Sequence, residues 1–180
     1  SVTTLFSQLI NSITASVGNL LVEKDKENSF IVYKKVRFLN FFIAVFCSIA
    51  LLIIIQSFIK IWLGSEYLLN TFIVIILIIN FYQKMMRLSN DLFLSAAGIC
   101  VENKFVPLAE SVLNIIFSII FVKIFGLAGV FMGTIVSSFA LWCYSYPKFV
   151  YKNLFCHTYK EFTRENVGYM VLFIVIATIT

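Results

Sequence analysis

The feature that most constrains this sequence is a long apolar run without a charge. No charged residue lies between Arg37 and Lys60, and polar and apolar side chains do not alternate within the run. A membrane-spanning α-helix needs about 20 predominantly apolar residues. Only helices and closed barrels satisfy their backbone hydrogen bonds inside lipid, and barrel strands alternate over about 10 residues. The run therefore predicts a transmembrane helix.

The composition of the whole chain also favours a membrane protein. Of its 180 residues, 61% are hydrophobic and 13% are charged, whereas globular domains are about 45–50% apolar and about 25% charged. A chain of this length could not bury so many apolar side chains in its own core. The composition excludes a soluble domain, a disordered tail and a nucleic-acid-binding module. A net charge of +5 would by itself suggest nucleic acid, but in a membrane chain the placement of Lys and Arg matters more than their sum, so no nucleic acid is expected as a partner.

Six apolar segments follow one another, which predicts an all-α integral membrane protein, a polytopic bundle of about six transmembrane helices. The segments are residues 2–22, 38–63, 70–101, 105–125, 129–151 and a last one that begins near Val167. The chain begins without Met and ends inside an apolar run. Residues 1–180 are therefore expected to form a single transmembrane bundle that is a fragment, with its first and last helices incomplete.

Basic residues gather in two connections between these segments. Residues 23–37 and 147–166 are rich in Lys and Arg, whereas the turns at residues 64–69 and 126–128 have none. Six alternating segments place both basic stretches on the same side of the membrane. The positive-inside rule predicts that this side is cytoplasmic.

The segment at residues 70–101 carries charges near its middle. Asn80, Lys84, Arg87 and Asp91 recur at helical spacing and so share one face. A charge at the centre of a membrane helix costs at least about 2.5–3.5 kcal/mol, so such residues face a partner helix or a water-filled cavity. We interpret this face as a cationic stripe lining a cavity for an anionic substrate, since Arg and Lys both bind phosphate.

Two alternatives for this segment remain open. It could form two short helices joined by an exposed loop at residues 83–91. Alternatively, Arg87 and Asp91 could neutralise each other, because residues four apart are neighbours on a helix. A continuous helix is favoured, because the part before residue 83 is too short to span a membrane untilted.

The segment at residues 105–125 has a second polar stripe that includes Glu110 and Asn114. Polar groups at this spacing can simply form interhelical hydrogen bonds, worth about 0.6 kcal/mol on average. Glu110 could instead counter the basic stripe or titrate, or lie at the membrane interface. We include both residues as candidate substrate-binding residues.

Further along the chain, small and aromatic residues predict packing and membrane anchoring. Gly129, Gly133 and Ser137 form a row of small residues that lets two helices approach closely. Four aromatic residues near the end of the segment at 129–151 predict an interfacial belt; they are Trp142, Tyr144, Tyr146 and Tyr151.

Catalytic motifs are missing from this sequence. It has a single histidine, His157, and neither a glycine-rich phosphate loop nor a nucleophile elbow. The four cysteines lie far apart and form no metal-binding spacing. We therefore expect neither an enzyme nor a bound cofactor or metal.

Two stretches resemble a known family. Residues 13–37, ITASVGNLLVEKDKENSFIVYKKVR, resemble a helix end and charged cytoplasmic loop of bacterial polysaccharide exporters. Residues 108–139, LAESVLNIIFSIIFVKIFGLAGVFMGTIVSSF, resemble their paired late helices, with a Pro-Lys exit at Pro147. The family is the O-antigen (Wzx-type) lipid-linked oligosaccharide flippases, within the multidrug/oligosaccharidyl-lipid/polysaccharide exporter superfamily.

This resemblance implies that the chain is the C-terminal half of a two-bundle exporter in the bacterial inner membrane. Such an exporter would flip an undecaprenyl-diphosphate-linked oligosaccharide, an O-antigen or capsule repeat unit, beside other polysaccharide-assembly proteins. Lys84 and Arg87 are then the candidate contacts of the diphosphate. Asp91 or Glu110 would be candidate sites for coupling to a proton or sodium gradient.

Three other functions compete with the flippase. A drug or cation antiporter of the same superfamily would prefer buried acids to buried bases. An integral-membrane polysaccharide-assembly enzyme would need a large loop outside the membrane, which these 180 residues lack. A purely structural membrane subunit would pair the charges of residues 84–91 with a partner's helix.

Overall fold

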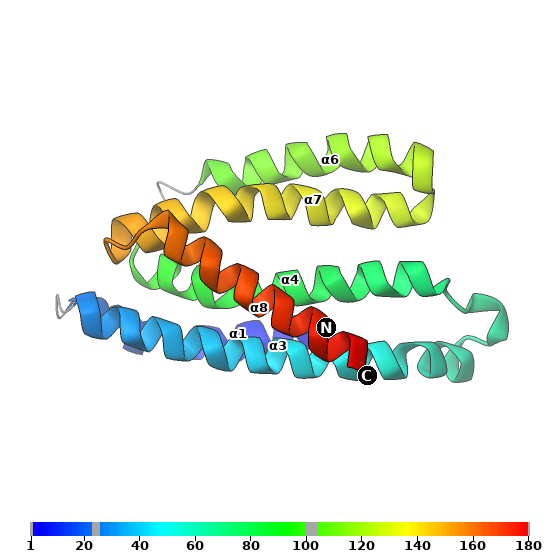
Figure 1. The fold of residues 1–180 in the computed structure, drawn as a ribbon, viewed down its shortest axis with the longest axis horizontal. Coiled ribbons are helices and arrows are strands. Elements are labelled where there is room, and N and C mark those ends of the chain that lie inside the picture. The colour runs from blue at the N-terminus through cyan, green and yellow to red at the C-terminus, as the bar shows by residue number, and fades with distance from the viewer. Residues whose placement is uncertain (1, 23–25, 100–103, 180) are drawn as a thin grey trace.

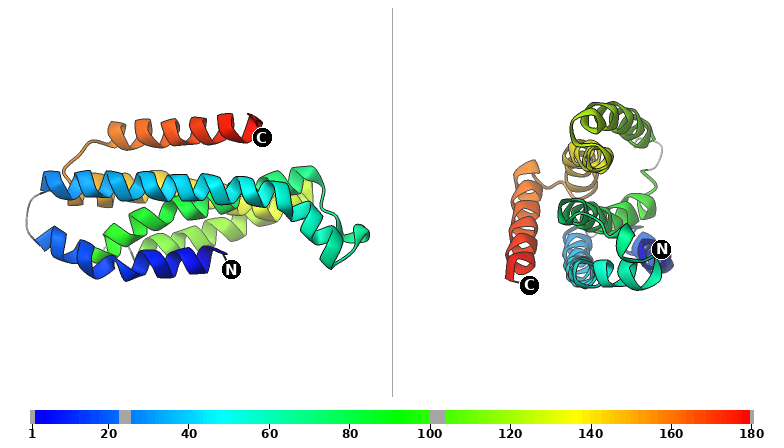
Figure 2. Two further views of the ribbon diagram at one scale, coloured as in Figure 1. Left: turned by 90° about the horizontal axis from the view of Figure 1, so that it is seen from below. Right: turned by 90° about the vertical axis from the view of Figure 1, so that its right-hand side faces the viewer.

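The computed structural model describes residues 2–22, 26–99 and 104–179, and within these ranges every regular element is helical. In chain order the elements are α1 (Val2–Ser12), α2 (Thr14–Val22), α3 (Lys26–Trp62), η1 (Ser65–Tyr67), α4 (Thr71–Ala96), α6 (Phe105–Phe125), α7 (Leu127–Tyr146), η2 (Pro147–Leu154) and α8 (Tyr159–Ile179). Helices α6, α7, α4 and α3 form a stack in that order (Figure 1). Helix α8 lies on one flank of the stack and α1 lies on the other (Figure 2).

Four helical stretches are long and apolar enough to cross a membrane. They are α3, α4, α6 and the stretch Leu127–Leu154 formed by α7 and η2. They correspond to the predicted segments at 38–63, 70–101, 105–125 and 129–151, so the structure indicates a helical membrane protein.

The two terminal segments are helical but are not among these four stretches. The first is divided into α1, with 11 residues, and α2, with 9 residues, each shorter than the roughly 20 needed to span. Helix α8 has 21 residues, but it opens with a charged stretch that includes Lys160, Glu161 and Arg164. The described residues therefore support four of the six expected spans.

The two polar connections were expected to be loops, but most of their described residues are helical. Residues 26–37 are the first turns of the 37-residue helix α3, which at 1.5 Å per residue is about 55 Å long, well beyond a hydrocarbon core of about 30 Å. Residues 147–154 form the π-helix η2, and α8 begins at Tyr159. Hydropathy marks where a chain enters lipid, but a polar stretch can continue the same helix into water. Residues 23–25 and 100–103, which include the predicted end of the third segment, lie outside the described residues.

Helix α4 is continuous from Thr71 to Ala96. The side chain of Asn70 caps it by accepting a hydrogen bond from the backbone N–H of Phe72 at 2.9 Å. Gly98, with φ of 71°, follows its C-terminal end. The alternative of two short helices with an exposed loop at residues 83–91 is therefore wrong, and the single-helix prediction is confirmed.

The row of small residues on α7 packs against α6, as predicted. A Cβ atom on Gly129 would lie 2.1 Å from the backbone oxygen of Phe121, and one on Gly133 would lie 2.6 Å from the backbone nitrogen of Ser118. Ser137 is fully buried. Gly126, with φ of 59°, forms the turn between the two helices. The result is a tight α6–α7 hairpin.

The aromatic residues of α7 and η2 do not form the predicted interfacial belt. Trp142, Tyr146 and Tyr151 are buried, and only Tyr144 is exposed, at 55%. The ring of Tyr151 lies 5.7 Å from that of Tyr33 on α3. These side chains form part of the packing between helices, and hold η2 against the start of α3.

Candidate functional site

The polar face of α4 lines a cavity between α4, α6 and α7. The cavity has a volume of about 500 Å³. Its lining combines polar and apolar side chains: Leu77, Asn80, Phe81, Gln83, Lys84, Arg87, Leu88, Asp91, Glu110, Phe131, Thr134 and Ser138. Because α4 is continuous, helical periodicity places its four predicted residues on one side of the helix. The predicted cavity is thus present, and it contains Asn80, Lys84, Arg87, Asp91 and Glu110.

Arg87 is paired with Glu110 across the cavity. Its Nη1 lies 2.5 Å from Oε1 and its Nη2 lies 2.9 Å from Oε2, the bidentate geometry that suits a guanidinium and a carboxylate. Pro107 lies in the first turn of α6, where its missing N–H has no intrahelical partner to lose. Glu110 follows three residues later and faces α4. The prediction that Glu110 counters the basic stripe is confirmed, and the predicted self-pairing of Arg87 with Asp91 is not found.

Helix α7 supplies hydroxyl groups that hold both acids. Tyr146 donates a hydrogen bond to Oδ1 of Asp91 at 2.6 Å and accepts one from Nε of Arg87 at 3.1 Å. Ser138 donates to Oε1 of Glu110 at 2.5 Å. Three helices therefore contribute to one connected polar network, and Tyr146 and Ser138 are site residues that the sequence analysis missed.

Lys84 differs from the other charged residues of the cavity. It lies at the midpoint of the 26-residue α4 and is exposed at the cavity wall. Within the described part of the chain, no side chain forms a hydrogen bond or ion pair with its ammonium group. Lys84 is therefore available to an anionic ligand.

The cavity is not the cationic stripe that the sequence predicted. Two bases, Lys84 and Arg87, are matched by two acids, Asp91 and Glu110. The sequence prediction missed this balance of charges because Glu110 comes from another helix, which periodicity within α4 cannot reveal. Of the two bases in the cavity, Arg87 is paired with Glu110, and Lys84 has no direct partner among the described residues.

Gln83 also lines the cavity and has an unpaired oxygen. Its side chain is 5% exposed, and its Nε2 donates to the backbone oxygen of Ile135 at 3.4 Å. Its Oε1 is buried without a hydrogen-bond partner among the described residues. A buried acceptor without a donor costs about 1–3 kcal/mol, so a ligand with hydroxyl groups would be favoured here.

Asn114 is not part of the cavity. Its Nδ2 donates to Oγ1 of Thr134 at 3.1 Å, and its Oδ1 accepts from Ser118 at 3.4 Å. The polar stripe of α6 therefore divides into Glu110, which faces the cavity, and Asn114, which binds α7. The role of Asn114 in substrate binding stays a prediction; in the structure the close α6–α7 contact places this amide in an interhelical hydrogen bond.

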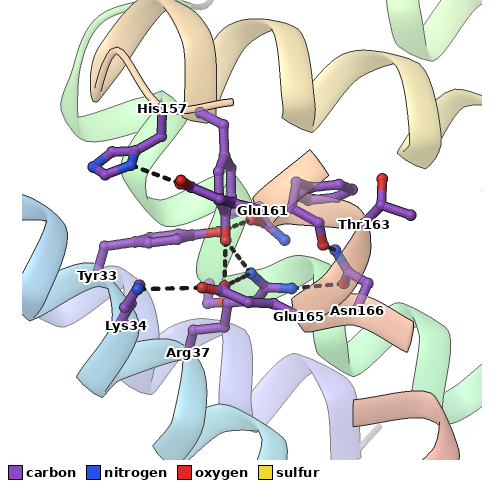
Figure 3. A network of polar contacts seen from close by, with 12 residues as sticks. Tyr33, Lys34, Arg37, His157, Glu161, Thr163, Glu165 and Asn166 are labelled. Carbon is purple, nitrogen blue, oxygen red and sulfur yellow. Dashed lines mark hydrogen bonds and ion pairs between the residues drawn. The ribbon is translucent and has the colours of Figure 1, made fainter. Parts of the chain in front are cut away.

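A second polar network joins α3, η2 and α8 (Figure 3). Arg37 is fully buried; it donates to the hydroxyl of Tyr151, to Oε2 of Glu165 at 2.9 Å and to Oδ1 of Asn166 at 2.6 Å. Lys34 lies 3.3 Å from the other oxygen of Glu165. The sequence analysis treated Arg37 as one of several loop cations. Its position at the border of a long apolar run was the available signal that it differs from them.

No protein-family model matches this chain, and neither the curated proteins nor the solved structures contain a match to it. The functional argument therefore depends on the geometry of the cavity.

Proposed function

We propose that this chain is part of a transporter that flips a polyprenyl-diphosphate-linked oligosaccharide across the bacterial inner membrane. The observation that carries the proposal is Lys84, a base at the middle of a membrane-length helix, exposed to a cavity and without a described partner. Uncompensated charge at this depth is costly and marks a substrate pathway. The resemblance of residues 13–37 and 108–139 to polysaccharide exporters supports the same substrate class.

The two ends of such a substrate suit different parts of the cavity. Lys84 would bind the diphosphate as a point charge. Arg87 is held by Glu110, so a phosphate would engage its guanidinium only by competing with that carboxylate. The sugar hydroxyls would bind the amide of Asn80, which lines the cavity. The basic stretches at 23–37 and 147–166 would face the cytoplasm, where the substrate is made.

The proposal is tested by replacing Lys84 in the full-length protein. Lys84→Gln should reduce surface polysaccharide by at least tenfold at unchanged protein level, and Lys84→Arg should retain most of it. Lys35→Gln is the matched control, since Lys35 is exposed on α3 and lies far from the cavity. Normal polysaccharide in Lys84→Gln and in Arg87→Ala would reject the substrate assignment.

A second candidate is a drug or cation antiporter of the same superfamily. It is favoured by the two acids, Asp91 and Glu110, that line the same cavity. In this case Asp91→Asn should abolish efflux of a cationic dye from cells, while Lys84→Gln should leave efflux intact. The opposite pattern, with loss of polysaccharide and no effect on dye efflux, supports the flippase.

A further inference from the structure

Helices α7 and α8 enclose a narrow apolar groove that the transport cavity does not include. The groove has a volume of about 90 Å³, and α4 forms its floor. Phe139, Trp142 and Cys143 of α7 line one side, and Phe162, Val167 and Met170 of α8 line the other. Most of the side chains that line it are apolar or aromatic, a lining that suits a segment of hydrocarbon chain.

A depression lined by basic side chains adjoins this groove. It lies toward the end of the molecule that carries the basic stretches at 23–37 and 147–166. Tyr159, Lys160 and Arg164 line the depression, which has a volume of about 470 Å³. Thr163 and Val167 line both the depression and the groove. Lys160 and Arg164 are four residues apart, so they lie one turn apart on α8. The surface therefore joins a paired positive charge to an apolar slot.

The acids of α8 do not neutralise these two bases. Glu165 binds Arg37 and Lys34, and Glu161 lies 2.7 Å from Nδ1 of His157. Figure 3 shows both acids in the network at the start of α8, with Thr163 pointing away from it. Within the described ranges, neither Lys160 nor Arg164 has a hydrogen-bond or ion-pair partner.

Trp142, which lines the groove, carries a polar group without a described partner. Its side chain is 6% exposed, and its Nε1 is buried without an acceptor among the described residues. Buried N–H groups are almost always hydrogen-bonded. An ester oxygen at the top of an acyl chain is an acceptor that would satisfy it.

We propose that the cleft between α7 and α8 binds an anionic phospholipid. Its phosphate lies between Lys160 and Arg164, because Arg and Lys are the side chains that bind phosphate. One acyl chain lies in the groove beside Trp142, Phe162 and Met170. The charge pair explains the preference for an anionic headgroup, and the groove explains the preference for a lipid over a free phosphate.

The test is lipid binding to the purified full-length protein, measured by native mass spectrometry. Phosphatidylglycerol should bind at least tenfold more tightly than phosphatidylcholine with the same acyl chains. Lys160→Gln/Arg164→Gln should remove this preference. Lys35→Gln/Lys104→Gln, which removes two charges without touching the depression or the groove, should keep it. Equal binding of the two lipids, or a preference that survives Lys160→Gln/Arg164→Gln, would overturn the proposal.

The acyl chain is placed by quenching of tryptophan fluorescence with brominated lipids. The quenching that belongs to Trp142 is the quenching in the parent minus that in Trp142→Phe. It should be larger for brominated phosphatidylglycerol than for brominated phosphatidylcholine. Equal quenching rejects the groove as the chain's position. If polyprenyl diphosphate displaces phosphatidylglycerol at an equal or lower concentration, the site belongs to that lipid and the phospholipid assignment is wrong. Lys84→Gln should leave phosphatidylglycerol binding unchanged, which separates this proposal from the proposed transport function.

Discussion

Arg87 of α4 and Glu110 of α6 face each other through two parallel contacts of 2.5 and 2.9 Å. Their side chains are 22% and 19% exposed, so the pair is partly shielded from water, where its attraction is stronger than at a fully exposed surface. The pair ties the α6–α7 hairpin to α4 and leaves Lys84 as the base of the cavity that has no partner among the described residues.

The pair should show a measurable coupling energy. Arg87→Ala and Glu110→Ala should each destabilise the protein by about 1.5–3 kcal/mol, the range for hydrogen bonds to charged groups. The double variant should lose less than the sum, since neither charge is then left unpaired. Equilibrium unfolding in mixed detergent micelles measures all three variants. Additive losses would mean that the two side chains do not interact.

The hydroxyl of Tyr146 should contribute more to the free energy of unfolding than the hydroxyl of Tyr144, which is exposed. Tyr146→Phe removes the hydroxyl that donates to Asp91 and accepts from Arg87, and should cost about 1–3 kcal/mol. Tyr144→Phe removes an exposed hydroxyl that contacts Lys148 at 3.0 Å, and should stay within about 0.5 kcal/mol of the parent. The same unfolding measurement compares them; equal effects would show that the buried hydroxyl adds nothing.

Much of α4 and of its polar face could be predicted from the sequence. Helical spacing alone places Asn80, Lys84, Arg87 and Asp91 together, because periodicity is a property of one helix. The partners of these residues could not be predicted in the same way. Glu110 binds Arg87 while Asn114, one turn further along α6, binds Thr134 of α7, and only the packing of three helices distinguishes them.

The ends of the helices were the least predictable part of the fold. The stretch before Arg37 is polar and was expected to be a loop, yet residues 26–36 form the first turns of α3. Two residues of this part of α3, Tyr33 and Arg37, are buried. They contact η2 and α8, which lie more than a hundred residues later in the sequence. Contacts between such distant residues leave no periodic signal, so the second network was missed.

The close contact between α6 and α7 should not tolerate an added methyl group. Gly133→Ala would bring a Cβ atom to 2.6 Å from the backbone of Ser118, and overpacking of this kind costs about 1–3 kcal/mol. Gly168→Ala on α8 is the matched control, because nothing lies within 4 Å of its added atom. Since Ala forms helix better than Gly, this variant should be neutral or slightly stabilised. Equal thermal stability of the two variants would refute the close packing.

Arg37 should hold the start of α8 against the bundle. Its guanidinium reaches Tyr151, Glu165 and Asn166 at once. Arg37→Met would leave the carboxylate of Glu165 with the hydroxyl of Tyr151 and with Lys34, which is half exposed. Arg37→Lys keeps the charge but lacks the planar fork that contacts several partners. Both variants should therefore loosen α8, the methionine variant more strongly.

Hydrogen–deuterium exchange measures this effect directly. In Arg37→Met the backbone amides of residues 159–166 should exchange at least tenfold faster than in the parent, because local opening of α8 no longer breaks the network. Lys35→Met, on an exposed position of the same helix, removes a charge without touching the network and should leave exchange unchanged. Unaltered exchange in Arg37→Met would show that α8 is held by its apolar contacts, such as the stacking of Phe173 on Tyr82 at 4.0 Å. Faster exchange in both variants would attribute the effect to net charge, because Arg37 is the one of these two replaced bases that binds Glu165 and Asn166.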